Sequence, residues 1–149
     1  MTAYYLDASA WVKRYCIEAG SSWVRQLFNS GALMCCATLG VVEVAATLAR
    51  KTRAGEIDRT LGEAMARRLR RDWSGFYQIE MTSGVLEAAL EAAGREALKG
   101  ADAVHLASAL IVADHLRRHA TELVFVASDR ELEQAAARAG LPTTDPAEK

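Results

Sequence analysis

Residues 4–11 read Tyr-Tyr-Leu-Asp-Ala-Ser-Ala-Trp, a short apolar run that ends in Asp7 and continues into a second apolar run. This pattern is typical of a buried strand that ends at a site in an α/β sheet. Such sheets bind ligands beyond the carboxyl ends of their strands, so Asp7 is placed for metal or phosphate chemistry rather than for packing. The function then depends on which other carboxylates join it.

Short apolar runs alternate with longer segments of helical period along the rest of the chain. We expect strands at 4–6, 33–37, 76–80 and 123–127, a short one near 142–144, and helices over 41–53, 56–72, 83–98 and 102–118. This alternation predicts an α/β fold, with βα units around a mainly parallel sheet of four to five strands.

The composition bounds the class of protein. A chain of 149 residues that is 51% hydrophobic and 25% charged predicts one globular domain over 1–149, with a loose tail after about Thr144. The net charge of -1 means that any nucleic acid must be bound by clustered basic residues. No disulfide framework, leader or membrane-spanning apolar run is readable, so we expect a cytoplasmic protein with no membrane partner.

Three further acids fall where strands end or helices begin: Glu43, Asp102 and Asp129. Taken singly, Asp102 and Asp129 are more simply helix caps, and residues 128–131, Ser-Asp-Arg-Glu, read as a capping box. If the sheet is doubly wound with its first strand central, however, all four acids meet at one edge.

Carboxylates that meet at one edge repel and raise one another's pKa, so this cluster predicts a bound divalent cation. Oxygen-only ligands favour Mg²⁺ or Mn²⁺ over zinc. A cation held in this way suits the hydrolysis of a phosphodiester by water.

Four motifs surround the acids: Tyr-Leu-Asp7-Ala-Ser9-Ala, Val-Val-Glu43-Val-Ala, Lys-Gly-Ala-Asp102-Ala-Val-His105-Leu-Ala and Val-Ala-Ser-Asp129-Arg-Glu-Leu. In order and separation they resemble the acidic motifs of PIN-domain ribonucleases, particularly the VapC-type toxins of bacterial toxin-antitoxin pairs. The resemblance covers nearly the whole chain, and its most specific part is the block around Asp102.

The resemblance implies a PIN-like three-layer α/β/α domain with the activity of a metal-dependent endoribonuclease. It implies Mg²⁺ or Mn²⁺ carried by Asp7 and Asp102 with help from Asp129, and Glu43 either as a ligand through water or as an activator of the attacking water. Ser9 would support Asp7 or the metal-bound water, although it equally suits the cap of the first helix. The partners implied are RNA, a second copy of the chain in a homodimer, and a VapB-like antitoxin whose C-terminal segment crosses the acidic cleft.

Basic residues gather at 50–53 and 67–71, where such runs usually form a solvated face. The functional alternative is a surface for the RNA backbone, and Arg50 is the best candidate because it shares a helix face with Glu43. His105 is expected to be packed or bonded to a carboxylate rather than to act as a general base. The three tryptophans are assigned by default to the core or to an interface.

Two other classes of function compete with the ribonuclease. A haloacid-dehalogenase-type phosphatase also places a nucleophilic aspartate after its first strand, the position of Asp7, but it usually needs a second aspartate where this chain has Ser9. A non-catalytic module that binds RNA or a partner fits the fold but not the complete acid set, because carboxylates without metal repel RNA. No short motif encodes which RNA is cut.

Overall fold

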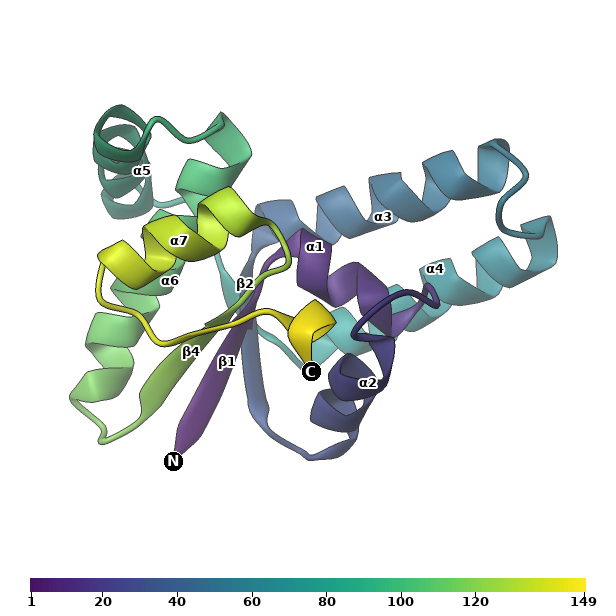
Figure 1. Ribbon diagram of the computed structural model, residues 1–149, viewed down its shortest axis with the longest axis horizontal. Coiled ribbons are helices and arrows are strands. Elements are labelled where there is room, and N and C mark those ends of the chain that lie inside the picture. Colours follow the sequence, from purple (N-terminus) through teal and green to yellow (C-terminus); the bar gives the residue numbers. More distant parts are fainter.

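The computed structural model describes residues 1–149 and is built on one parallel sheet (Figure 1). Its strands are β1 (Thr2–Leu6), β2 (Leu33–Ala37), β3 (Tyr77–Ile79), β4 (Glu122–Val126) and β5 (Thr143–Thr144). Their order is β3-β2-β1-β4-β5, and every neighbouring pair is parallel. The prediction of a parallel sheet with a central first strand is therefore confirmed.

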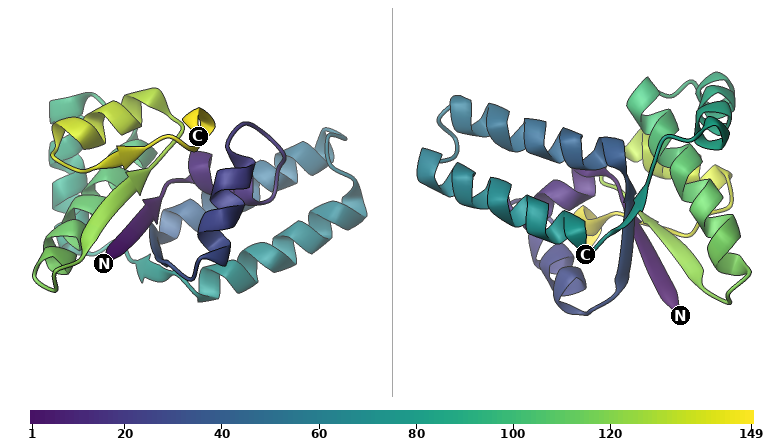
Figure 2. Two further views of the ribbon diagram at one scale, coloured as in Figure 1. Left: turned by 60° about the horizontal axis from the view of Figure 1, so that its bottom comes forward. Right: turned by 180° about the vertical axis from the view of Figure 1, so that it is seen from behind.

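Helices cover both faces of the sheet. They are α1 (Ala8–Trp11), α2 (Ser21–Asn29), α3 (Thr38–Arg53), α4 (Arg59–Ser74), α5 (Ser83–Glu96), α6 (Gly100–Arg117) and α7 (Arg130–Arg138), with short 3₁₀ helices η1 (Val12–Arg14) and η2 (Pro146–Glu148). Figure 2 shows α1 to α4 on one side of the sheet and α5 to α7 on the other, with α3 and α4 paired in a projecting hairpin. This three-layer α/β/α arrangement confirms the predicted fold class.

The direction of winding reverses at β1. The chain runs from β1 to β2 and β3 on one side, then crosses to β4 and β5 on the other. Leu6 lies beside Val126 in the pairing of β1 with β4, so the two strands end together. A doubly wound sheet binds ligands at such a switch point, outside the carboxyl ends of its strands.

Aromatic side chains fill the core on both sides of the sheet. Trp11 is fully buried, and its ring stacks on Phe76 at 4.5 Å between centroids. Tyr5 is also fully buried and stacks on Phe125 at 5.2 Å. Trp11 therefore belongs to the core, as expected by default, and is not a platform for stacking bases.

Three helices differ in their starts from the prediction, and the smallest difference is at α6, which begins at Gly100 rather than Asp102. α3 begins at Thr38, immediately after β2, because the extended Ala37 passes directly from strand to helix without a loop or a side-chain cap. α4 begins at Arg59 rather than Glu56, because the side chain of Asp58 accepts hydrogen bonds from the first free amides of that helix.

The capping box over 128–131 is wrong, because Asp129 itself caps α7 by accepting a hydrogen bond from Leu132 N at 3.1 Å. The Ser128 hydroxyl instead donates to Asp145 at 2.7 Å. That bond joins the end of β4 to the tail, where η2 forms and Pro146 is buried. No helix is both long and apolar enough to span a membrane.

Candidate active site

Asp7 lies where β1 ends and is 4% exposed. Its backbone amide donates to Val126 O at 3.1 Å, which fixes it between β1 and β4. Its carboxylate caps α1 by accepting a hydrogen bond from Ala10 N at 3.0 Å on Oδ1. The Ser9 hydroxyl lies 2.8 Å from both carboxylate oxygens, but it has one proton to donate. The carboxylate therefore keeps acceptor capacity on Oδ2.

The pKa of Asp7 is raised from 3.8 to about 6. Burial is the main cause, and the charge of Asp102 raises it further. His105 and the hydrogen bonds from Ser9 and Ala10 oppose this rise. A buried carboxylate with a pKa raised in this way is expected at a functional site, where a cation restores the ionised form.

Ser9 ties the two central strand ends together. While its hydroxyl donates to Asp7, its Oγ accepts a hydrogen bond from Ser128 N, just beyond β4, at 3.0 Å. Asp7, not Ser9, is the cap of α1. The cap reading of Ser9 is therefore wrong, and its contact with Asp7 is the one expected of a supporting residue.

Asp102 lies in the first turn of α6 and is partly buried. Burial raises its pKa, and the negative charges of Asp129 and Glu43 raise it further, whereas His105 and Lys99 lower it. It does not cap the helix, because that position is taken by Lys99. The acids are thus close enough to influence one another, as the sheet topology led us to expect.

Glu43 lies in α3, and its side chain is 31% exposed. One carboxylate oxygen, Oε1, lies 2.5 Å from Nε2 of the buried His105. The expectation of a carboxylate-bonded histidine at position 105 is therefore confirmed. The second oxygen, Oε2, makes no hydrogen bond within the protein.

The donor set fits a hard divalent cation in its chemistry, because it offers carboxylate oxygens at partly buried positions. Asp7 can still accept a further bond on its carboxylate, and the negative charges of Asp129 and Glu43 disfavour the ionised form of Asp102 unless a cation is bound. No three acidic, histidine or cysteine side chains are grouped closely enough to form a ready-made metal cage. The carboxylates would have to close around an ion.

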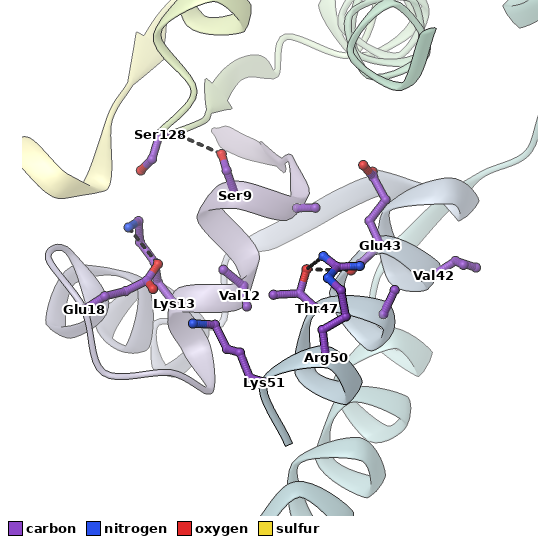
Figure 3. A pocket seen from close by; sticks show the side chains of 12 residues that line it. Ser9, Val12, Lys13, Glu18, Val42, Glu43, Thr47, Arg50, Lys51 and Ser128 are labelled. Atoms are coloured by element: carbon purple, nitrogen blue, oxygen red, sulfur yellow. Dashed lines mark hydrogen bonds and ion pairs between the residues drawn. The ribbon is translucent and has the colours of Figure 1, made fainter. Parts of the chain in front are cut away.

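A cleft of about 620 Å³ opens beside the acids, between α1–η1 and α3 (Figure 3). Ser9, Glu43 and Ser128 line it at the acidic end, and the cations Arg50 and Lys51 line it further along α3. Asp7, Asp102 and Asp129 are not among its lining residues. Ser9 and Glu43 therefore connect the cleft to the carboxylates behind it.

Lys13 also lines this cleft, and the sequence analysis did not predict a role for it. It is 6% exposed and pairs with Glu18 at 3.0 Å. The signal that was available is its spacing of four residues from Ser9, which places both on one side of a helical turn.

Arg50 makes no ion pair, and its guanidinium donates to Thr47 at 3.1 Å. The cations at 67–71 lie outside the cleft lining.

Comparison with known proteins agrees with this geometry. The PIN domain family model matches residues 4–138. The chain is 38% identical over 144 residues to Ribonuclease VapC45 of Mycobacterium tuberculosis (strain CDC 1551 / Oshkosh), covering 94% of this chain and 93% of that protein.

Solved structures share the fold. PAE2754 from Pyrobaculum aerophilum aligns with a TM-score of 0.66 at 24% identity, covering 99% of this chain and 85% of that one. A chain of a toxin-antitoxin complex from Klebsiella pneumoniae aligns with a TM-score of 0.60 at 16% identity, covering 96% and 97%. The family model and the identity to the Mycobacterium relative show that the chain belongs to the PIN domain family, among the VapC-type toxins.

Proposed function

We propose that this protein is a metal-dependent endoribonuclease that hydrolyses RNA phosphodiesters and is the toxin of a VapBC-type pair. The observation that carries the proposal is the buried Asp7 carboxylate at the switch point, whose pKa is raised to about 6 by burial and, in smaller part, by Asp102. The identity to a relative named as a ribonuclease supports the same chemistry.

Asp7 and Asp102, with help from Asp129, would hold Mg²⁺ or Mn²⁺. A divalent ion bound there supplies charge to stabilise the leaving oxygen and lowers the pKa of the attacking water. Ser9 keeps Asp7 in place through its hydroxyl. Glu43 has Oε2 free at the end of the cleft to orient the water or to accept its proton.

The basic part of the cleft would hold the RNA backbone. Arg50 and Lys51 lie on the same helix as Glu43 and line the same cleft, so phosphates flanking the scissile bond would meet cations there. The chain as a whole carries a net charge of -1 and does not attract a polyanion by itself. Local binding of this kind is therefore required.

A VapB-like antitoxin is the proposed protein partner, because the Klebsiella neighbour is a chain of a toxin-antitoxin complex. Its C-terminal segment would lie across the cleft and bring a basic residue to the acids. We further propose a homodimer and a cytoplasmic location. Light scattering of the free protein tests the dimer, and a single monomeric mass at micromolar concentration would contradict it.

The activity is tested with structured RNA in Mg²⁺, in Mn²⁺ and in chelator, using the wild type, Asp7→Asn and Asp114→Asn. Asp114 is the matched control, because its side chain is 64% exposed on α6. We expect metal-dependent cleavage by the wild type and the control, and none by Asp7→Asn. Cleavage in chelator, or full activity of Asp7→Asn, would contradict the mechanism.

The same assay separates the competing functions. The family assignment already weighs against the phosphatase, and turnover of a phosphomonoester with a trapped aspartyl-phosphate would be needed to restore it. RNA binding without cleavage, by protein free of antitoxin, would instead indicate a non-catalytic module.

A further inference from the structure

Three buried or partly buried side chains form a continuous hydrogen-bonded chain behind the cleft. The amide of Ala37, at the junction of β2 and α3, donates to the Tyr5 hydroxyl at 3.2 Å. That hydroxyl lies 2.7 Å from Nδ1 of His105, and Nε2 of His105 lies 2.5 Å from Glu43 Oε1. This series of hydrogen bonds links β1, α6 and α3 and ends at Glu43, which lines the cleft.

The donors and acceptors of this chain assign its protons. An ionised carboxylate only accepts hydrogen bonds, so Nε2 of His105 carries the proton that is directed at Glu43. The Tyr5 oxygen accepts from Ala37 and has its own proton to donate to Nδ1. Burial raises the pKa of Tyr5 well above its ordinary value, which keeps that proton on the hydroxyl. The geometry thus selects the Nε2–H tautomer.

Packing holds the His105 ring in this orientation. The residue is 1% exposed, and its ring meets Tyr5 edge-on, with centroids 5.8 Å apart and an angle of 80°. Tyr5 is stacked in turn on Phe125. On the α3 side, a Cβ at Gly40 would lie 3.2 Å from Cε1 of His105, so the absence of a side chain there admits the ring.

We propose that His105 is a positioning residue, which holds the Glu43 carboxylate by a hydrogen bond from Nε2 while the Tyr5 hydroxyl donates to Nδ1. This inference rests on the proposed function for the role of Glu43. A partly exposed glutamate otherwise samples several rotamers, and fixing one of them places Oε2 for the attacking water. His105 touches neither the RNA nor the reacting atoms. Residues that orient a ligating carboxylate commonly change activity by about 10- to 100-fold when removed.

The kinetic test compares His105→Phe, which keeps the ring volume without a donor, with His105→Gln, which restores a donor near the position of Nε2. We expect His105→Phe to lower kcat by about 10- to 100-fold with little change in KM. His105→Gln should recover most of that loss. His115→Gln is the control, because His115 is an exposed histidine on the same helix. Equal losses in the Phe and Gln variants would overturn the proposal.

A second measurement needs no activity. In ¹⁵N NMR spectra of the metal-free wild type, His105 should show a protonated Nε2 and an unprotonated Nδ1. Tyr5→Phe should leave the proton on Nε2, where Glu43 accepts it, but should shift the Nδ1 resonance because the hydrogen bond from the Tyr5 hydroxyl is lost. A His105 signal with an unprotonated Nε2 would overturn the inference even if the protein cuts RNA. The expected signal in a protein that cuts no RNA would preserve the geometry and reject only the proposed function.

Discussion

Replacing Asp7 with asparagine is expected to stabilise the metal-free protein at neutral pH while it abolishes activity. Asp7 has a folded-state pKa of about 6 against an ordinary value of 3.8. Each pKa unit corresponds to about 1.4 kcal/mol, so the ionised carboxylate costs the fold about 3 kcal/mol above pH 6. Asparagine keeps an oxygen for the Ser9 and Ala10 donors but leaves amide protons poorly paired. We therefore expect a net gain of about 1 to 3 kcal/mol.

The gain should depend on pH in a defined direction. Between pH 3.8 and about 6, the folded wild type binds more protons at Asp7 than the unfolded chain does. Its free energy of unfolding therefore falls as the pH rises through this window, whereas that of the asparagine variant lacks this contribution. The difference between the two proteins should be small near pH 4 and reach its full size above pH 7.

Urea unfolding followed by circular dichroism, with chelator present, measures this difference at pH 4, 5.5 and 7.5. For a chain of this size, 1 kcal/mol corresponds to roughly 2 to 4 °C in Tm, so thermal melts give a second reading. Added Mg²⁺ should stabilise the wild type and not Asp7→Asn. The reasoning is refuted if the variant is less stable than the wild type at pH 7.5, or if the difference does not change with pH. Asp114→Asn should show neither effect.

Three further substitutions probe the same region. Ser9→Ala should raise the pKa of Asp7 further, because the Ser9 hydroxyl bond lowers it, and an unchanged value in a ¹³C carboxyl titration would contradict this. Arg50→Ala should weaken RNA binding and reduce the salt dependence of log K by about one phosphate contact, with an unaltered slope counting against the cleft as the RNA site. Gly40→Ala should lower the free energy of unfolding, measured in urea, by about 1 to 3 kcal/mol, because its methyl group would overlap Cys36. The control Gly94→Ala adds a methyl group in open space and should be neutral or stabilising.

The strands were the most predictable part of the fold. β2 begins at Leu33 and ends at Ala37 as expected, because a short apolar run between Gly31 and Thr38 is a strong local signal. The start of α3 carries no such signal, because Ala37 has no side-chain oxygen to cap the helix. The short helix η2 in the tail carries no such local signal either, because Asp145 at its start is bonded to Ser128, a contact distant in sequence.

The positions of the candidate acids followed from the topology, but their contacts did not. The apolar run before Asp7 predicts a strand end, and the parallel order brings that end beside β4. Nothing local predicts that Tyr5, inside the same strand, reaches His105 across 100 residues. The position of Lys13 in the cleft was not predicted, because it depends on the turn formed by α1 and η1.

The acids of this edge also lie at the beginnings of helices, where the backbone itself carries partial positive charge. Asp102 is in the first turn of the 18-residue α6, and Asp129 caps α7. The peptide dipoles thus offset part of the mutual repulsion before any ion arrives. The remaining cost at Asp7, about 3 kcal/mol, is small beside the roughly 5 to 15 kcal/mol that typically holds a domain folded. Removal of the cation by a chelator should therefore abolish activity without unfolding the protein, and activity should return when the cation is restored.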